Sequence, residues 1–268
     1  MQKQLRPVVF LVMTLIVSGL LAMNTNRTIL ISAHRGASGL APENTLATFQ
    51  EALRQGTDYL EIDVRTTRDS QLVILHDGTL DRTTKANGPV ADRTWKELKS
   101  IPAGKGWPDF KQPIPTLAEV CQLVTRWNAD HPTKAKLYVD CKAVEPRPLV
   151  HVLKKYNLEK EAVFYGNDAY LAQLKQEDSS LQLMPAFPKM GNWQEKAERL
   201  KPYAFDVAAE LLTPALVAEL HKHHILVFVD LLDHKDTLLW YRKAVTCGVD
   251  CIQTDHVTEL RRALAQMP

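Results

Sequence analysis

Carboxylate side chains alternate with apolar ones in one short stretch of the chain. Glu61 and Asp63 stand two positions apart, and Leu60, Ile62 and Val64 lie beside them. Because successive side chains of a strand point to opposite faces, the two carboxylates share one face, roughly 6–7 Å apart. Their mutual repulsion and their burial raise a pKa unless a cation neutralises them. A hard ion with oxygen ligands, such as Mg²⁺ or Ca²⁺, is the natural partner.

Residues 136–142 repeat this arrangement. Tyr138, Asp140 and Lys142 fall on one face of the predicted strand, and apolar side chains fall on the other. Asp140 can therefore supply a third carboxylate, and Lys142 can supply a fixed positive charge beside it.

Two histidines come at the ends of predicted strands. His34 follows residues 29–33 and precedes Arg35, and His76 ends residues 72–76. Histidine transfers protons near neutral pH, and arginine binds phosphate through a bidentate fork. In combination with a metal ion, these groups indicate attack on a phosphodiester.

Each of these residues also has a structural explanation when it is taken alone. His34 fits a buried core histidine, and Arg35 fits an ordinary ion pair. Asn44 fits the N-cap of a helix that begins at Thr45, and Glu43 fits a charge that stabilises the same helix terminus. What favours a functional site is that the whole set converges on one rim of the predicted fold.

Short apolar runs and helical patterns alternate along the chain. The predicted strands are residues 29–33, 59–64, 72–76, 136–142, 162–165, 181–186, 204–207, 225–230 and 251–254. The predicted helices include residues 45–54, 117–127, 148–156, 214–221, 238–247 and 257–265. About eight strand–helix units in this length predict an α/β fold of the (β/α)₈ TIM-type barrel class, whose active sites lie at the C-terminal strand ends. Residues 78–115 are rich in Pro and Gly, so we expect an insertion over one end of the barrel.

The N-terminal segment is separate from this pattern. Lys3 and Arg6 precede an apolar run at residues 7–22. We therefore assign residues 1–23 to a signal peptide or an N-terminal membrane anchor, and residues 24–268 to the barrel domain. Export to a periplasmic or extracellular location is expected, with membrane proximity through this segment. The four cysteines are too few for a disulfide scaffold and lie within predicted elements, as buried small side chains do.

The charge balance excludes a nucleic-acid partner. The chain has 33 Lys and Arg against 31 Asp and Glu, and Lys3 and Arg6 account for the difference. No basic surplus remains to bind a phosphate backbone. The chain also has no glycine-rich nucleotide loop of either common type.

Several motifs together resemble the glycerophosphodiester phosphodiesterase family, within the phospholipase C-like phosphodiesterase superfamily. The most specific are His34-Arg35-Gly36, Pro42-Glu43-Asn44-Thr45, Glu61-x-Asp63-Val64, His76-Asp77 and Leu80-Asp81-Arg82-Thr83-Thr84. Looser ones follow at Ile114-Pro115-Thr116-Leu117, Asp140-x-Lys142 and Gly248-Val249-Asp250-x-Ile252-x-Thr254-Asp255.

This resemblance implies a barrel, a bound divalent metal ion, and hydrolysis of glycerophosphodiesters to glycerol 3-phosphate and an alcohol in lipid metabolism. It assigns catalysis to His34 and His76. It assigns metal binding to Glu61, Asp63 and Asp140, and the phosphate side to Arg35, Glu43 and Lys142.

Two positions depart from the family pattern. Most members carry Glu where this chain has Asp140, which is one methylene shorter. Val229-Asp230-Leu231-Leu232 replaces a Trp-Thr-x-Asn string, with Val229 taken as the counterpart of the Trp. Only one of Val229 and Asp230 can face the barrel mouth. We expect Asp230 to do so, since a carboxylate packed against the helices is costly, and this favours a polyhydroxylated or cationic headgroup.

Two other functions fit the same motifs. One is phospholipase D-like hydrolysis of lysophospholipid or sphingolipid headgroups. The other is a catalytically silent barrel that binds phosphodiesters. The two histidines and the three filled carboxylate positions argue against the silent barrel.

Overall fold

The computed structural model describes residues 28–37, 39 and 41–267. The predicted signal peptide or anchor at residues 1–23 lies outside them, and export stays a prediction. Among the described residues, no helix has both the length and the apolar character that a membrane crossing requires.

Nine strands lie within the described part of the chain and form one sheet. They are β1 (Leu30–Ala33), β2 (Tyr59–Thr66), β3 (Leu72–Ile74), β4 (Lys136–Ala143), β5 (Val163–Tyr165), β6 (Gln182–Met184), β7 (Ala204–Asp206), β8 (Leu226–Asp230) and β9 (Cys251–Thr254). Eight of them are arranged in the order β6-β5-β4-β2-β1-β9-β8-β7, and the paired neighbours along this path run parallel. A parallel bridge between Ala186 and Asp206 joins the two ends of this path. The predicted (β/α)₈ barrel is confirmed.

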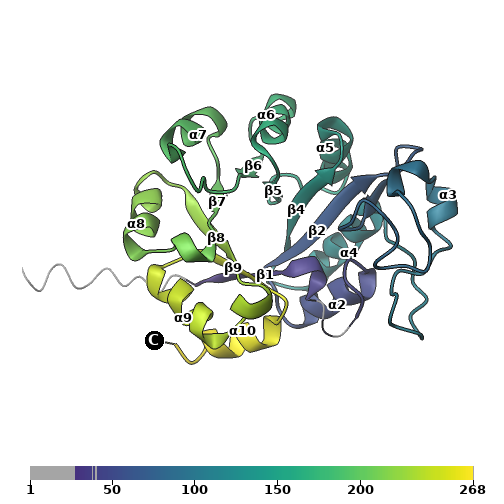
Figure 1. Ribbon diagram of the computed structural model, residues 1–268, viewed down its shortest axis with the longest axis horizontal. Coiled ribbons are helices and arrows are strands. Elements are labelled where there is room, and N and C mark those ends of the chain that lie inside the picture. Colours follow the sequence, from purple (N-terminus) through teal and green to yellow (C-terminus); the bar gives the residue numbers. More distant parts are fainter. Residues whose placement is uncertain (1–27, 38, 40, 268) are drawn as a thin grey trace, which may run out of the picture.

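Helices surround the strands on the outside (Figure 1). They are α2 (Leu46–Arg54), α4 (Leu117–Asp130), α5 (Pro146–Lys155), α6 (Asp168–Glu177), α7 (Trp193–Leu200), α8 (Pro214–Lys222), α9 (Leu238–Cys247) and α10 (Val257–Leu264). α4 shows why such segments fold as they do. Thr116 and Glu119 form a capping box at its start, and its buried residues recur at helical spacing, as an amphipathic helix requires. They are Leu117, Val120, Cys121 and Val124.

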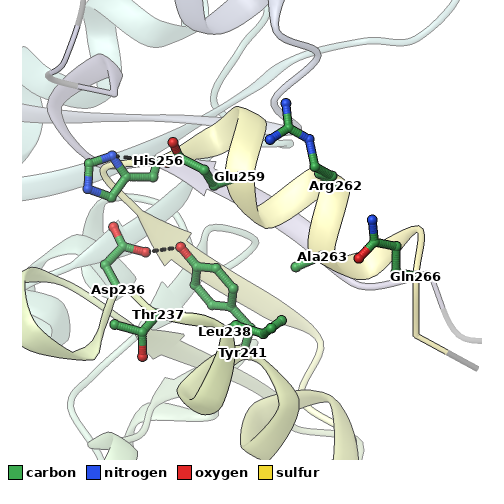
Figure 2. A pocket seen from close by; sticks show the side chains of 9 residues that line it. All are labelled: Asp236, Thr237, Leu238, Tyr241, His256, Glu259, Arg262, Ala263 and Gln266. Carbon is green, nitrogen blue, oxygen red and sulfur yellow. Dashed lines mark hydrogen bonds and ion pairs between the residues drawn. The ribbon is translucent and has the colours of Figure 1, made fainter.

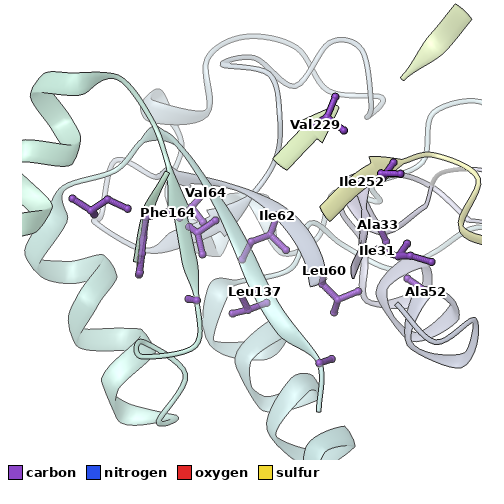
Figure 3. Packing of buried hydrophobic residues seen from close by; sticks show 14 of the residues in the cluster. Ile31, Ala33, Ala52, Leu60, Ile62, Val64, Leu137, Phe164, Val229 and Ile252 are labelled. Carbon is purple, nitrogen blue, oxygen red and sulfur yellow. The ribbon is translucent and has the colours of Figure 1, made fainter. Parts of the chain in front are cut away.

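The apolar face of each strand packs against the helices and forms the layer between the barrel and the helices. Leu60, Ile62 and Val64 of β2 are fully buried there, with Val229 of β8 and Ile252 of β9 in the same cluster (Figure 3). The alternation predicted from the sequence is confirmed. It follows that the intervening side chains of these strands point into the barrel.

The barrel interior is filled with side chains at its floor. Tyr59, Tyr138 and Phe228 form one buried cluster, in which the Tyr59 and Phe228 ring centroids are 5.6 Å apart. The pleat that points Tyr59 inward also points Glu61 and Asp63 inward, nearer the C-terminal end of β2. The filled floor leaves only the C-terminal mouth for chemistry, as in other barrels of this type.

One predicted strand behaves differently from expectation. β3 runs antiparallel to β2, with Ile74 opposite Val64, and no helix separates the two strands. Their connection is a tight turn in which Ser70 takes a positive φ of 62°. β3 therefore forms a hairpin beside the barrel, and it ends before His76.

The insertion follows this hairpin as expected and includes the short helix α3 (Trp95–Leu98). It packs on β3 through its own apolar cluster. The cluster consists of Val73, Leu75, Leu80, Val90, Leu98, Ala103 and Ile114.

Gly36 provides a test of how tightly the first strand–helix connection is packed. Its φ is +90°, and a Cβ placed there meets the Thr48 Cγ2 at 2.4 Å. Gly88 has the same φ of +90° but open space around it. We predict that Gly36→Ala lowers the free energy of unfolding by about 2–5 kcal/mol, from strain plus overpacking, and Gly88→Ala by about 1–2 kcal/mol. Urea denaturation of both variants checks this, and equal losses would contradict the packing argument.

Candidate active site

Three carboxylates converge where β2 and β4 lie side by side. Asp63 and Asp140 are paired directly across the two strands, and Glu61 lies one pleat earlier on β2. Glu61, Asp63 and Asp140 each offer one oxygen within 4.8 Å of the others. Glu61 is only 2% exposed and Asp63 only 1%. The cluster predicted from the sequence is brought together by strand register.

The electrostatics of this cluster are unfavourable without a cation. Burial, and then the neighbouring Asp63 and Asp140, raises the pKa of Glu61 well above its usual range. Burial also raises the pKa of Asp140, although Lys142 beside it opposes the rise. Oxygen ligands only, and a surplus of negative charge, fit a hard divalent ion such as Mg²⁺ or Ca²⁺.

Neighbouring groups hold the three acids in place. The Asn44 Nδ2 donates to the Asp63 Oδ2 at 2.7 Å, and the backbone N–H of Arg35 donates to the Glu61 Oε2 at 2.7 Å. Lys142 lies on β4, with its Nζ 2.5 Å from the Asp140 Oδ2 and 3.3 Å from the Asp63 Oδ1. In this arrangement Lys142 contacts the acids themselves.

Asn44 is not the helix N-cap that it resembles in the sequence. Thr45 is the N-cap of α2, because its side chain accepts the backbone N–H of Thr48. Asn44 instead takes a positive φ of 56° and turns its amide to Asp63.

Each histidine is paired with a carboxylate through its Nδ1. The His34 Nδ1 lies 2.9 Å from the Asp255 Oδ1, and the His76 Nδ1 lies 2.7 Å from the Asp77 Oδ1. A carboxylate that accepts the Nδ1 proton leaves Nε2 to exchange a proton with a substrate. Sequence reasoning did not assign Asp255 or Asp77 to the site, although both stand in its motifs.

His76 reaches the rim by a different route from His34. It was expected at the end of a barrel strand, but it lies on the segment that returns after the β2–β3 hairpin. The Arg65 Nε donates to the backbone carbonyl oxygens of Leu75 at 3.2 Å and of His76 at 3.0 Å. This contact fixes the returning segment against β2, beside the carboxylates.

A network of ion pairs links the rim to the insertion. Arg82 donates to both oxygens of Glu43 at 2.7 Å and to the Asp77 Oδ2 at 2.7 Å. Arg35 reaches the same Glu43 carboxylate at 3.1 Å. Burial by itself would raise the pKa of Glu43. The hydrogen bonds and charges of Arg82 and Arg35 outweigh burial, and the pKa of Glu43 is lowered. Arg82 is a residue of this network that sequence reasoning left without a role, because it lies in a segment without periodicity.

The carboxylate partner of His34 is itself supported from outside the barrel. The backbone N–H of Asp255 donates to the Asp236 Oδ2 at 2.8 Å. The Asp236 Oδ1 accepts from the Thr254 hydroxyl at 2.6 Å and from the Tyr241 hydroxyl. Figure 2 shows the hydroxyl of Tyr241 directed at the Asp236 carboxylate. Both side chains line a hollow of about 470 Å³, together with other residues of α9, α10 and the segments just before them. No member of the carboxylate cluster lines this hollow.

The two alternatives on β8 are resolved by side-chain direction. Val229 is buried in the layer against the helices, so an aromatic ring at that position would not line the mouth. Asp230 faces the interior, where Asp206, His34 and Asp140 all act on its ionisation. The expected orientation of Asp230 is confirmed.

The model of the Glycerophosphoryl diester phosphodiesterase family matches residues 34–259, which include both histidines and all three carboxylates. The chain belongs to this family. Its relatives include the glycerophosphodiester phosphodiesterase of Caldanaerobacter subterraneus subsp. tengcongensis. The two are 33% identical over 235 residues, which cover 84% of this chain and 93% of the relative.

Solved structures of the family agree with the fold. A glycerophosphodiester phosphodiesterase from Agrobacterium tumefaciens has a TM-score of 0.78 at 25% identity, over 88% of this chain and 100% of the other. A phosphodiesterase from Oleispira antarctica, solved in complex with the product sn-glycerol-3-phosphate, has a TM-score of 0.77 at 27% identity. That match covers 88% of this chain and 97% of the other.

The repulsion within the cluster predicts how this family member responds to neutralising Glu61. In chelator, Glu61→Gln should raise the free energy of unfolding near neutral pH, on the order of 1 kcal/mol or more. Because the pKa of Glu61 is raised on folding, the gain should be absent below about pH 4 and should appear as the pH rises above 4.5, the ordinary value.

Urea denaturation of wild type and variant across this pH range measures the difference. The exposed Glu198→Gln is the matched control and should show no such pH-dependent gain. A Glu61→Gln variant that is destabilised near neutral pH in chelator would contradict the repulsion.

Proposed function

We propose that this protein hydrolyses glycerophosphodiesters to glycerol 3-phosphate and an alcohol, with a divalent metal ion and acid–base catalysis by histidine. The observation that carries the proposal is the convergence of three carboxylates, two of them buried and Asp140 partly buried, beside two histidines that are each oriented by a carboxylate of their own. The product complex of the Oleispira antarctica relative supports the substrate class.

Glu61, Asp63 and Asp140 are the residues that would hold the metal ion. When bound, such an ion supplies Lewis-acid polarisation of a phosphate oxygen and orients the reacting groups. Asn44 and the Arg35 backbone N–H hold two of these carboxylates from behind. The oxygens are thus held in position before the substrate arrives, so no reorganisation of these groups is needed during the reaction.

The histidines move the protons. The Nε2 of one takes a proton from the nucleophile, and the Nε2 of the other gives a proton to the leaving alkoxide. The nucleophile is either water or the glycerol hydroxyl of the substrate, which would give a cyclic intermediate. Asp255 and Asp77 stabilise the protonated imidazole in each case and fix its orientation.

The phosphate side of the site is built around Arg35. Its guanidinium lies at the rim between Glu43 and Asp63, where it can add a bidentate contact to a phosphate. Glu43 is itself an anion, and its oxygens already accept from two arginines, so its role is to position Arg35. Lys142 limits the repulsion among the acids and adds positive charge toward the phosphate.

Metal binding is the first consequence to test. Wild-type protein should bind one Mg²⁺ or Ca²⁺ per chain, and Glu61→Gln should weaken the affinity by on the order of 10- to 100-fold. Arg35→Ala should weaken it less, because the Arg35 side chain is assigned to phosphate. Isothermal titration of chelator-treated protein with each ion measures all three. Equal affinity of wild type and Glu61→Gln would remove the cluster from metal binding.

Proton transfer is the second consequence. His34→Ala and His76→Ala should each lower kcat by on the order of 10² or more. His151→Ala, an exposed histidine on α5, is the matched control and should keep wild-type kcat. Release of glycerol 3-phosphate from glycerophosphodiesters, with lysophospholipids as comparison substrates, provides the assay.

Thermal unfolding of both variants should stay cooperative, because neither histidine belongs to an apolar layer. If either variant retains wild-type kcat on a diester, that histidine is structural. Turnover of lysophospholipids alone would identify the phospholipase D-like activity instead.

A further inference from the structure

A second pair of carboxylates faces the barrel interior, apart from the proposed metal ligands. Asp206 ends β7 and Asp230 ends β8, two neighbouring strands on the far side of the barrel from β2. The two groups act on each other: after burial, Asp206 is the largest cause of the raised pKa of Asp230. Burial, followed by the charge of Asp140, raises the pKa of Asp206 to about 7.

No described lysine, arginine or histidine forms an ion pair with Asp230, although the charges of His34 and Lys142 partly offset the rise of its pKa. The Asp230 Oδ1 is buried and accepts no hydrogen bond from any described residue. Asp206 makes no ion pair with the described lysines, arginines and histidines, whereas Asp63 and Asp140 each contact Lys142. A buried carboxylate with an unmet acceptor is costly, so the site is complementary to a positive charge that arrives from outside.

Aromatic rings connect this pair with the catalytic centre. Tyr165 of β5 is the direct cross-strand partner of Asp140, and its ring centroid lies 6.2 Å from that of Tyr138. After burial, Asp206 and Asp230 are the largest causes of the raised pKa of Tyr165. The carboxylate pair and Asp140 therefore all act on the Tyr165 side chain. Aromatic faces beside carboxylates are the usual surroundings of a bound alkylammonium group.

We infer that Asp206 and Asp230, with Tyr165, form a subsite that selects substrates whose alcohol carries a positive charge. The inference rests on the proposed function, because it places the phosphate at the three carboxylates and the substituent across the barrel mouth. A neutral polyol forms hydrogen bonds with carboxylates but leaves their charge uncompensated. An ammonium or quaternary ammonium group neutralises it, and so gains more from this site.

Kinetic selectivity tests the subsite. The selectivity ratio is the kcat/KM for the cationic substrates, glycerophosphocholine and glycerophosphoethanolamine, divided by the kcat/KM for the polyol substrates, glycerophosphoglycerol and glycerophosphoinositol. Wild type should favour the cationic substrates by about tenfold or more. Asp206→Asn, Asp230→Asn and the double variant should each reduce this ratio, the double variant most. Asp233→Asn alters an exposed carboxylate just after β8 and should keep the wild-type ratio.

Titration with tetramethylammonium chloride gives a readout without turnover. Wild type and Asp233→Asn should bind the ion, and the double Asn variant should bind it at least about tenfold more weakly. Asp206→Asn and Asp230→Asn are isosteric changes that remove repulsion between the two carboxylates, so the unfolding of each variant should stay cooperative.

Failure of the subsite and failure of the proposed function give different results. If wild type hydrolyses none of the four diesters, the proposed function fails, while tetramethylammonium binding still tests the carboxylate pair. Hydrolysis with the same ratio in wild type and the double variant overturns the subsite and leaves the function standing. A second Mg²⁺ or Ca²⁺ per chain that is lost in the double variant overturns it too, since the pair would then be a metal site.

Discussion

Glu61, Asp63 and Asp140 repel one another at close range in a place from which water is largely excluded, and the structure around them is organised to keep them there. The parallel pairing of β2 with β4 sets Asp63 against Asp140, so the repulsion opposes a register that many backbone hydrogen bonds maintain. The apolar layer of Leu60, Ile62 and Val64 prevents β2 from turning its acids outward. The consequence of this constraint is a cluster of negative charge whose oxygens could hold a metal ion.

The remaining parts of the rim offset or use that negative charge. Asn44 and the Arg35 backbone donate hydrogen bonds to it, and Lys142 places an ammonium beside it. Farther out, Arg35 and Arg82 share Glu43, and Arg82 also fixes Asp77. The insertion that carries Arg82 thereby connects His76, through Asp77, with Arg35, through Glu43. Both histidines are then directed by acids that lie outside the three-carboxylate cluster.

Period-two alternation predicted more of this site than any other signal. It set the inward direction of Glu61, Asp63, Asp140 and Asp230 correctly, because side-chain direction along a strand is a local property. It failed for the segment that leads to His76, because a turn at Ser70 reverses the chain and turn geometry is not visible in the alternation. The barrel class followed from the strand–helix alternation in the same way.

What the sequence left out depends on contacts between distant segments. Asp255 meets His34 across 221 positions, and Arg82 meets Glu43 across 39. Neither contact is encoded by a local pattern. The N-cap explanation of Asn44 is wrong for the related reason that its side chain binds a distant partner, Asp63, instead of the local helix terminus. Helices α6 and α7 were not predicted, and α6 buries only Leu171 and Leu174, so its periodicity is weak.

We propose that these three carboxylates make the chain a metal-dependent glycerophosphodiester phosphodiesterase. Phosphorus NMR of glycerophosphoethanolamine, incubated with metal-stripped and then metal-restored protein, tests it most directly. We expect no turnover without metal, and sn-glycerol 3-phosphate as the phosphorus-containing product once Mg²⁺ or Ca²⁺ is restored. Phosphoethanolamine as the product, or equal turnover in protein shown by elemental analysis to lack metal, would contradict it.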